Sequence, residues 1–354
     1  MQAVILAGGQ GTRLRPLTAR TPKPMVPLFD RPVMEHTLLL LRKHGIQQVF
    51  VTLSYRAREI IDYFGGGSRW GMRIHYSIED EPMGTAGGVR RFAGSLHDTF
   101  LVISGDAVTD FDLSEAVAFH RRHGAIATML LYSVDDPTPF GIVETDKDGR
   151  IRRFLEKPSA NEVFTNTVNT GIYVLEPYAL RFVPDDQPFD FSRNLFPRLL
   201  ANNDPFFGFR AQGYWCDIGN LLQYRQAHFD ALANKVSLNL PAELVRPGGW
   251  IGENAVVDGN VKLEPPFYIG AGTRLQRGAS IGKHAVIGAG CLVETEASIH
   301  ASVVGPGARV GAGTRLTHCV VDSCAHVEAR TALSNAVLSV ETMAPLASSL
   351  PAAA

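Results

Sequence analysis

Several features that would assign the chain to a special class of protein are missing from its sequence. No apolar run approaches the ~18 residues that a membrane-spanning helix requires, and the nearest, from His36 to Leu41, is short and amphipathic. Met1 leads within a few residues into a strand-like segment, without a basic region or a cleavage site. We therefore expect neither membrane association nor secretion.

Cysteine is scarce, and neither sign of charge is in excess. The cysteines lack the C-x-x-C spacing of a zinc ribbon and suggest no disulfide framework, which fits the reducing cytoplasm. They are Cys216, Cys291, Cys319 and Cys324. With 34 basic and 35 acidic residues the net charge is −1, which excludes a general nucleic-acid binder held by a basic surface.

The chain is too long for one hydrophobic core of average size. Its 354 residues exceed the ~100–200 of a typical domain, so we expect two domains. With 45% hydrophobic and 19% charged residues, the composition is that of a globular protein rather than a disordered one.

Up to about Asn234, short apolar runs alternate with segments of helical periodicity. This alternation is typical of an α/β fold, here a Rossmann-like, mostly parallel mixed sheet covered on both faces. Ligands of such sheets bind beyond the carboxyl ends of the strands, so we expect the site at the loops after Ala7 and Ile103. Strands are predicted at 3–7, 48–53, 73–78, 99–103 and 126–133, and helices at 33–44, 58–64, 86–92 and 112–123.

From about Pro247, aliphatic residues recur at every sixth position. These residues are Ile251, Val257, Leu263, Ile269, Leu275, Ile281, Ile287, Val293 and Ile299. The register then slips by one residue to resume at Val304, and slips again to Val321. An apolar period of six is the signature of a parallel β-helix, in which each hexapeptide forms one flat face.

These two patterns divide the chain into parts. We expect a catalytic domain at 1–235, a linker at 236–249, a β-helix at 250–340 and a loosely ordered tail at 341–354. A solenoid has open ends and flat faces that must be capped or buried. We therefore also expect a homo-oligomer formed through the β-helix.

A glycine-rich loop follows the first predicted strand, in the sequence Leu-Ala-Gly-Gly-Gln-Gly-Thr-Arg-Leu-Arg-Pro-Leu-Thr that begins at Leu6. Its glycines let the backbone approach a phosphate chain and point N–H groups at it. Arg13 can bind phosphate oxygens with two hydrogen bonds, and Lys23 in Pro-Lys-Pro adds a compact positive charge. The Gly-Lys-Ser/Thr of a P-loop is absent, and Leu14 breaks the G-x-G-x-x-G spacing of a dinucleotide-dependent dehydrogenase.

This loop and a series of later motifs resemble those of the sugar-1-phosphate nucleotidyltransferases. The later motifs are Glu81-Pro-Met-Gly-Thr-Ala-Gly, Ser104-Gly-Asp, Phe140-Gly-Ile-Val-Glu, Phe154-Leu-Glu-Lys-Pro, Asn169-Thr-Gly-Ile-Tyr and Gly213-Tyr-Trp-Cys-Asp-Ile-Gly. The resemblance covers residues 2–235, and many members carry a left-handed β-helix behind this domain. The Pro-Met-Gly-Thr-Ala-Gly and Gly-Tyr-Trp-Cys-Asp-Ile-Gly motifs, with Phe-Asp-Phe at 189–191, are most similar to those of the mannose-1-phosphate guanylyltransferases.

The resemblance implies a reaction and a role for each candidate residue. A sugar phosphate attacks the α-phosphorus of a nucleoside triphosphate in line with departing pyrophosphate, and Mg²⁺ is held by Asp106 and Asp217. We expect Arg13 on the β- and γ-phosphates, Lys23 near the transferred group and Lys157 on the sugar phosphate. The other nucleotide-binding candidates are Leu6, Ala7, Gly8, Gly9, Gly11, Thr12, Glu79, Glu81, Gly84 and Thr85, with Asp106 itself. The sugar-phosphate pocket would comprise Gly141, Glu156, Lys157, Asn169 and Thr170.

Residues 79–88 lie where this family holds the base. Guanine presents two N–H donors on one edge, which a carboxylate can accept, whereas thymine and uracil suit an amide. Glu79 or Glu81 therefore favours GTP, with mannose 1-phosphate as acceptor and GDP-mannose as product. Thymidylyl or adenylyl transfer to glucose 1-phosphate is the alternative reaction.

The sequence also bears on two functions of other classes. A non-catalytic regulatory subunit of the same fold would bind nucleotide sugar without turnover, but the five charged site residues that catalysis needs are all present. β-Helices also serve as acyltransferases, and four histidines are candidates for the general base of such chemistry. They are His284, His300, His318 and His326. The β-helix expected here is short and has no extended loop that could cover an acyl donor, which argues against this activity.

Overall fold

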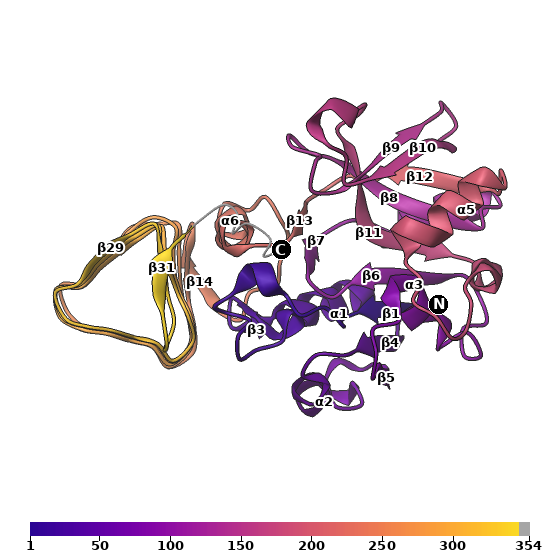
Figure 1. Ribbon diagram of the computed structural model, residues 1–354. Helices are drawn as coiled ribbons and strands as arrows, with labels where there is room; N and C mark the ends of the chain where they lie inside the picture. The colour runs from indigo at the N-terminus through magenta and orange to yellow at the C-terminus, as the bar shows by residue number, and fades with distance from the viewer. Residues whose placement is uncertain (347–354) are drawn as a thin grey trace. The chain divides into compact units, whose positions relative to one another are not determined.

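A computed structural model describes residues 1–346, which form two units that are described separately (Figure 1). The sheet unit comprises Met1–Gly9 and Thr37–Trp215. The β-helix unit comprises Gln10–His36 and the described chain from Cys216 onward. By their contacts, residues 10–36 and 216–235 group with the β-helix, while the domain limits expected from the sequence stay a prediction.

The sheet unit is built on a nine-stranded mixed sheet. Its strands are β1 (Gln2–Leu6), β4 (Gln48–Leu53), β5 (Arg73–Ile78), β6 (Phe100–Ser104), β8 (Ala127–Ser133), β9 (Gly141–Thr145), β10 (Ile151–Glu156), β11 (Thr167–Leu175) and β12 (Phe206–Arg210). β6, β1, β4 and β5 run parallel in that order, and β11 lies antiparallel to β6. β9 and β8 pair with β11, and β12 runs parallel to β8. The predicted α/β class with a mostly parallel mixed sheet is confirmed.

Helices and short turns complete this unit. They are α2 (Ala57–Phe64), α3 (Gly84–Arg90), α4 (Leu113–Arg122), α5 (Phe196–Ala201), the π-helical turn η6 (Phe191–Leu195) and the short strand β7 (Ala107–Thr109); α1 (Val33–Lys43) and β13 (Trp215–Asp217) cross the boundary between the units. α4 begins where the Asp112 carboxylate accepts the N–H groups of Ser114 and Glu115, at 2.9 and 3.0 Å. Its last turn is basic, which the helix dipole favours.

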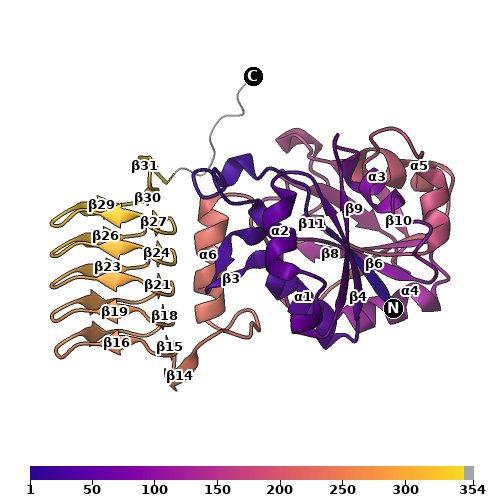
Figure 2. The ribbon, with the colours of Figure 1, turned by 90° about the horizontal axis from the view of Figure 1, so that it is seen from below.

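The β-helix unit contains three sheets, one on each face, whose strands run parallel except at the two ends of the first sheet. The first holds β14 (Glu243–Arg246), β15 (Gly249–Ile251), β18 (Phe267–Ile269), β21 (Ala285–Ile287), β24 (Val303–Val304), β27 (Val320–Val321), β30 (Ala336–Leu338) and β31 (Met343–Pro345). The second holds β16 (Val256–Val257), β19 (Arg274–Leu275), β22 (Leu292–Val293), β25 (Arg309–Val310) and β28 (His326–Val327). The third holds β17 (Lys262–Leu263), β20 (Ser280–Ile281), β23 (Ser298–His300), β26 (Arg315–Thr317) and β29 (Ala332–Ser334). Figure 1 shows this helix end-on as a triangle, and Figure 2 shows its stacked coils from the side.

The slips in the six-residue period shorten one corner of each later coil. Ile251 pairs with Ile269, eighteen positions on, and Ile269 with Ile287, again eighteen. Ile287 then pairs with Val304, seventeen positions on. The sheets nevertheless stay in register, because the missing residue comes from the corner after β23, where Ala301 adopts a left-handed φ of 44°. The predicted β-helix is confirmed.

Antiparallel strands lie at both ends of the first sheet. β14 pairs with β15, and β31 pairs with β30. β31 lies in the stretch from 341 that was expected to be a loosely ordered tail; residues 347–354 of that stretch lie outside the described residues. The first coil remains incompletely covered, since Leu244, Val256 and Val257 are 56%, 44% and 37% exposed.

The segment 10–36 is fixed to the β-helix by a half-buried carboxylate, that of Asp30. It contains η1 (Thr12–Leu14), η2 (Lys23–Met25), β2 (Pro27–Leu28) and β3 (Arg31–Pro32). Asp30 accepts the hydroxyl of Tyr268 at 2.8 Å and the N–H of Ala289 at 2.7 Å, and burial raises the pKa of its carboxyl. The helix α6 (Leu221–Leu232) runs along the same side of the coils (Figure 2), and its Tyr224 hydroxyl donates to the Pro27 carbonyl at 2.7 Å.

Candidate functional site

The glycine-rich loop is held in shape by contacts with the residues that follow it. Gly11 has a φ of 65°, and a Cβ there would lie 2.9 Å from Cβ of Lys23 and 3.1 Å from Cγ2 of Thr18. Thr18 in turn donates its hydroxyl to the Gly11 carbonyl at 2.7 Å. A side chain at position 11 would therefore be strained and would displace Lys23.

Three charged residues of the predicted site gather in the β-helix unit. Nζ of Lys23 lies 3.6 Å from Oδ1 of Asp217, and the two side chains are 12% and 26% exposed. The third charged residue is Arg13. A Cβ on Gly219 would lie 3.0 Å from Asp217 Oδ2 and 3.4 Å from a guanidinium nitrogen of Arg13, so the two side chains approach the same point. Asp217 is thus a neighbour of Arg13 and Lys23, although about 200 residues of chain separate it from them.

Leu6 and Asp106 stand together at the carboxyl ends of two adjacent strands of the sheet unit. β1 and β6 pair in register from Gln2 with Phe100 to Leu6 with Ser104, and the N–H of Gly105 donates to the Leu6 carbonyl at 2.9 Å. The hydroxyl of Ser104 donates to a carboxylate oxygen of Asp106. The loops after Ala7 and Ile103, from which the site was predicted, therefore begin side by side.

The β9–β10 hairpin holds the predicted sugar-phosphate residues. Gly141 pairs with Glu156, and a Cβ on Gly141 would lie 2.7 Å from Glu156 Oε2 and 2.8 Å from the Phe154 ring. Burial raises the pKa of the Glu156 carboxyl. Lys157 follows with a φ of 49°, and its N–H donates to the carbonyl of Phe140 at 3.0 Å.

Asn169 and Thr170 use their polar groups inside the fold. The Asn169 amide donates to the Tyr173 hydroxyl at 3.0 Å and accepts the N–H of Gly171 at 2.9 Å. The Thr170 hydroxyl donates to the Leu130 carbonyl at 2.8 Å, and this side chain is buried. Both side chains are therefore hydrogen-bonded within the fold, and their contact with a sugar phosphate stays a prediction.

On the predicted base side, Glu79 and Glu81 differ in environment. Glu79 is buried, its Oε2 accepts the N–H of Met83 at 3.1 Å, and burial raises the pKa of its carboxyl. A Cβ on Gly88 would lie 2.4 Å from Glu79 Oε1, so glycine there leaves room for the carboxylate. Glu81 is exposed.

Sequence reasoning missed two residues that support this site. Trp215 donates from Nε1 to the Thr170 carbonyl at 3.1 Å and stacks edge-on against Phe140, with ring centroids 5.2 Å apart. Asp190 accepts both the N–H and the hydroxyl of Thr85, at 3.0 and 3.1 Å. Both lie inside motifs that the sequence analysis used only as family markers, Gly213-Tyr-Trp and Phe-Asp-Phe, so their positions were visible but their contacts were not.

The predicted metal ligands were tested against the donors present. Among residues 1–346, no group of three His, Cys, Asp or Glu side chains is placed to hold a metal ion. Asp106 lies in the sheet unit and Asp217 in the β-helix unit. Both offer carboxylate oxygens, and Mg²⁺ takes one or two carboxylates together with water and substrate phosphate oxygens. The donor chemistry therefore fits Mg²⁺.

The four candidate histidines of the β-helix do not all gather at one place in the described chain. His284 packs against Phe229, with ring centroids 5.3 Å apart. The rings of His300 and His318 lie 6.2 Å apart and nearly perpendicular, and His326 stands on another strand, β28, beside Glu328.

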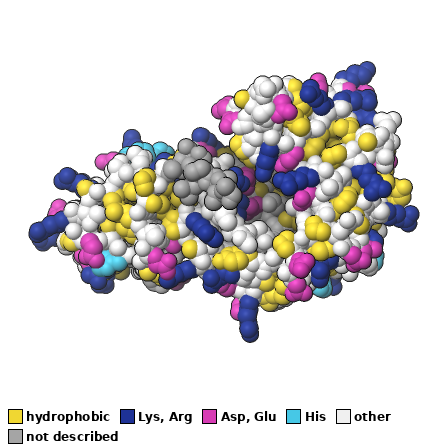
Figure 3. Space-filling view, viewed as in Figure 1, with side chains coloured by type: hydrophobic (Ala, Val, Ile, Leu, Met, Phe, Trp, Pro, Cys, Tyr) yellow, Lys and Arg dark blue, Asp and Glu magenta, His cyan; other side chains and the backbone are white. Residues whose placement is uncertain are grey.

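The surface carries charges of both signs. On the face drawn in Figure 3, Lys and Arg side chains are scattered with acidic side chains between them. This distribution agrees with the net charge of −1. Within the described residues, no helix is long and apolar enough to cross a membrane.

Comparison with known proteins identifies the family. Residues 2–234 match the family described as nucleotidyl transferase. The chain belongs to that family. Residues 271–336 of this nucleotidyl transferase match a second family, described as GlmU-like, C-terminal hexapeptide, which is the β-helix part.

Curated relatives place it among sugar-1-phosphate nucleotidyltransferases. A UTP–glucose-1-phosphate uridylyltransferase of Synechocystis sp. is 39% identical over 91% of this chain and 87% of its own length. A mannose-1-phosphate guanylyltransferase of Mycobacterium tuberculosis is 36% identical over 83% of each chain. Among solved structures, HddC from Yersinia pseudotuberculosis in complex with GMP-PN is 29% identical, with a TM-score of 0.56 over 64% of this chain and 97% of its own. The family resemblance seen in the motifs is confirmed.

Proposed function

We propose that the protein transfers a guanylyl group from GTP to mannose 1-phosphate, forming GDP-mannose and releasing pyrophosphate. The observation that carries this proposal is the Glu79 carboxylate, buried beside the segment that begins α3. A carboxylate is an acceptor for both N–H donors of guanine. The mannose-1-phosphate guanylyltransferases among the relatives, from bacteria, plants and flies, support the same choice.

In this reaction two anions, the sugar phosphate and the nucleoside triphosphate, must approach each other. The protein mainly positions them and neutralises their charge, and it need form no covalent bond to either. An oxygen of the sugar phosphate attacks the α-phosphorus, and the bond to the β-phosphate oxygen breaks as pyrophosphate leaves. We assign Arg13 to the β- and γ-phosphates, Lys23 to the region of the transferred group and Lys157 to the sugar phosphate. Backbone N–H groups of the loop from Leu6 to Thr12 would receive the phosphate chain.

We assign the Mg²⁺ ligands to Asp106 and Asp217. When bound, Mg²⁺ neutralises charge on the phosphate oxygens of the substrates. The ion pair between Lys23 and Asp217 supports this assignment, because it orients the carboxylate that would hold the ion. The same pair holds the Lys23 ammonium in a position where a triphosphate could replace Asp217 as its anionic partner.

A second candidate is uridylyl transfer from UTP to glucose 1-phosphate. It is favoured by the Synechocystis relative, whose 39% identity exceeds that of the mannose-1-phosphate guanylyltransferase of Mycobacterium tuberculosis. Uracil presents one N–H between two carbonyl oxygens, so it requires a donor as well as an acceptor. Thymidylyl and adenylyl transfer to glucose 1-phosphate are the remaining alternatives.

One assay tests the proposal against all of these. Pyrophosphate release is measured with GTP, UTP, dTTP and ATP, each paired with mannose 1-phosphate and glucose 1-phosphate, in the presence and absence of Mg²⁺. We expect the highest kcat/KM with GTP and mannose 1-phosphate and no release without the metal. A preference for UTP and glucose 1-phosphate would replace the proposal with the second candidate. Tight nucleotide binding without release for any pair would support a regulatory subunit instead.

We also propose that copies of the chain associate through the β-helix and that the protein works in the cytoplasm. The exposed apolar side chains of the first coil, at Leu244, Val256 and Val257, support association because water contact with them is unfavourable. Sedimentation of wild type and Val257→Lys tests it, with dissociation expected in the variant. The four thiols, which form no disulfide in the described chain, suit a reducing compartment, and fractionation of cells tests that assignment.

A further inference from the structure

The segment from Phe189 to Leu195 packs against the start of α3, which the sequence predicts to hold the nucleotide. Gly84 has a φ of 72°, and a Cβ there would lie 2.7 Å from the carbonyl oxygen of Phe189. That carbonyl accepts the N–H groups of Ala86 and Gly87, both at 2.9 Å. The N–H of Phe189 donates to the Met83 carbonyl at 2.8 Å. Backbone therefore lies directly on backbone, and the two segments must move together.

Asp190 adds side-chain hydrogen bonds to this contact. Its Oδ1 accepts the N–H of Thr85 at 3.0 Å and the Thr85 hydroxyl at 3.1 Å. The same hydroxyl accepts the N–H of Phe191 at 3.0 Å. Thr85, one of the predicted nucleotide-binding residues, thus has both its N–H and its hydroxyl occupied by this segment.

The other end of the segment reaches the predicted sugar-phosphate pocket. Phe191 begins the π-helical turn η6, a rare conformation that is frequent at functional sites. Within it, Ser192 accepts a hydrogen bond from the Asn169 amide at 3.5 Å and forms another with the Glu156 carboxylate. The Phe191 ring packs on Tyr173 with centroids 5.0 Å apart, which holds the turn against β11.

A continuous series of contacts therefore joins the two carboxylates assigned to the two substrates. It begins at Glu79, which accepts the N–H of Met83 at the start of α3. It passes through Thr85 and Asp190 and ends at Ser192 and Glu156. All of these residues belong to the sheet unit.

We propose that Asp190 is a positioning residue that couples the nucleotide segment to the sugar-phosphate pocket, so that binding of one substrate raises the affinity for the other. The physical reason is that a substrate that orders this segment leaves less ordering for its partner to impose. By linkage the effect is reciprocal. This inference rests on the proposed function, because it takes the two ends of the segment to be the two substrate subsites.

Calorimetry on the full chain measures the coupling directly. The affinity for mannose 1-phosphate is compared with and without saturating Mg²⁺ and α,β-methylene-GTP, which cannot release pyrophosphate. We expect the nucleotide to tighten sugar-phosphate binding by about 5-fold or more in the wild type, the lower end of typical couplings. In Asp190→Ala we expect a factor near one. Asp190→Asn should retain the coupling, because its amide oxygen can accept the same two hydrogen bonds.

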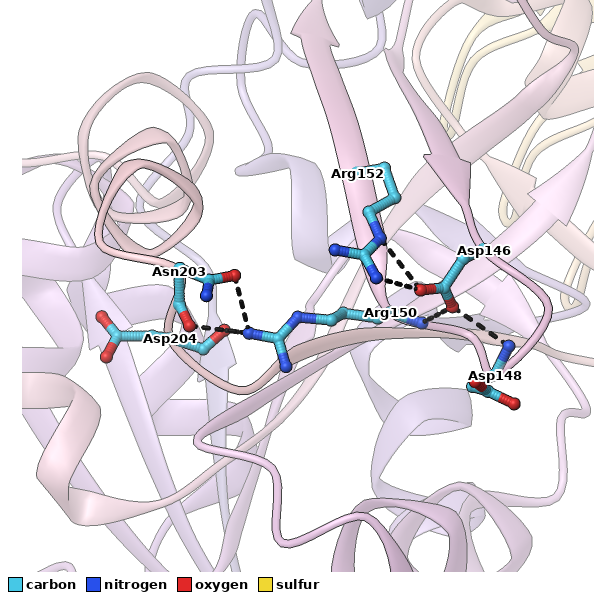
Figure 4. Close-up of polar contacts among 6 residues, drawn as sticks. All are labelled: Asp146, Asp148, Arg150, Arg152, Asn203 and Asp204. Carbon is cyan, nitrogen blue, oxygen red and sulfur yellow. Dashed lines mark hydrogen bonds and ion pairs between the residues drawn. The ribbon is translucent and has the colours of Figure 1, made fainter.

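A matched control comes from the other end of the β9–β10 hairpin (Figure 4). Like Asp190, Asp146 accepts two hydrogen bonds, here from the local N–H groups of Asp148 at 3.0 Å and Arg150 at 2.9 Å, and it pairs with Arg152. It lies in the turn between the two strands, whereas Gly141 and Glu156 lie at their opposite ends. Asp146→Ala removes contacts of the same kind and should leave the coupling factor unchanged.

The possible results separate the inference from the proposed function. Equal coupling in Asp190→Ala and wild type, or loss of coupling in Asp146→Ala as well, would overturn the inference while pyrophosphate release by the wild type stands. Absence of turnover with any substrate pair would overturn the proposed function. Should Asp190→Ala unfold, Ser192→Ala breaks the same path at its other end, and it too must lower the coupling. If the double variant Asp190→Ala with Ser192→Ala folds, the two substitutions should have non-additive effects on the coupling, since both interrupt the same path.

Discussion

Lys23 and Asp217 form an ion pair with 3.6 Å between Nζ and Oδ1, although nearly 200 residues separate them in the chain. Both belong to the β-helix unit, in which the segment 10–36 is fixed to the coils through Asp30. The part of the predicted phosphate-binding loop from Gln10 onward, with Lys23 after it, is therefore attached to the β-helix. This relationship gives the first of four predictions.

Lys23→Ala should lower kcat by roughly 10²–10³-fold while the protein stays folded, because a preorganised charge near the transferred phosphate is removed. Asp106→Ala should have an effect of at least this size. Pyrophosphate release and the circular dichroism spectrum are the measurements. Lys235→Ala is the control, since it breaks a lysine–aspartate pair of 2.8 Å in the same unit, at a side chain that is 62% exposed. A near-normal kcat in Lys23→Ala would contradict its assigned role.

Glu79→Gln should shift base selectivity from GTP toward UTP or dTTP. The amide offers a donor beside an acceptor, and a lost or gained hydrogen bond in a base pocket changes the ratio of kcat/KM values by about 10-fold or more. Since burial raises the pKa of Glu79, acidification should also lower kcat/KM for GTP in the wild type as the carboxylate is protonated. Glu81→Gln, at an exposed position, is the parallel variant. If it rather than Glu79→Gln changes selectivity, then the base-binding acid is Glu81.

Asp30→Ala should destabilise the β-helix unit by about 2–4 kcal/mol, because the hydroxyl of the buried Tyr268 and the N–H of the half-buried Ala289 lose their acceptor. Asp30→Asn should cost less, since it keeps an acceptor and lacks the charge that burial disfavours. Urea unfolding measures both. Asp136→Ala is the control: that exposed carboxylate accepts the N–H and hydroxyl of Thr138 and should change stability by less than about 1 kcal/mol. Equal losses at positions 30 and 136 would contradict the anchoring role.

Stability should fall as the pH drops from 6.5 to 4. Burial lowers the pKa of His36 and of His228 to about 4, below the ~6.5 of an unfolded chain. In that window the unfolded chain binds more protons, so each histidine removes up to roughly 3 kcal/mol on acidification. Asp322, whose pKa burial raises to about 6, has the opposite effect and offsets part of the loss. Urea unfolding at several pH values measures how steeply the free energy of unfolding depends on pH. His228→Gln should reduce this dependence, and an unchanged dependence would contradict the role given to His228.

Much of the fold could be predicted because its signals are local. The six-residue period follows from stacking equal faces, and the slips at Val304 and Val321 are visible as shortened repeats before any coordinates exist. The parallel part of the sheet follows from alternating strands and helices. The antiparallel β31 could not be predicted, because its exposed residues carry no period and its pairing with β30 is a tertiary contact.

The candidate site divides in the same way. Residue types next to one another in the chain, such as the glycines before Arg13, already indicate phosphate binding, because close backbone approach and positive charge are local requirements. Asp190 and Asp30 could not be assigned in advance. Their roles depend on which donors the fold brings to them, Thr85 in one case and Tyr268 in the other, from about 100 and 240 residues away.

The sequence by itself determined the class of fold, the solenoid period and the family, since each is written in spacings of a few residues. Only the tertiary structure decided that residues 10–36 belong with the β-helix, and that one short segment carries contacts from the α3 loop to the β9–β10 hairpin. Hydrogen bonds between distant segments form where folding brings a donor and an acceptor together and removes water from both. The order of residues along the chain does not show which distant groups will meet in this way.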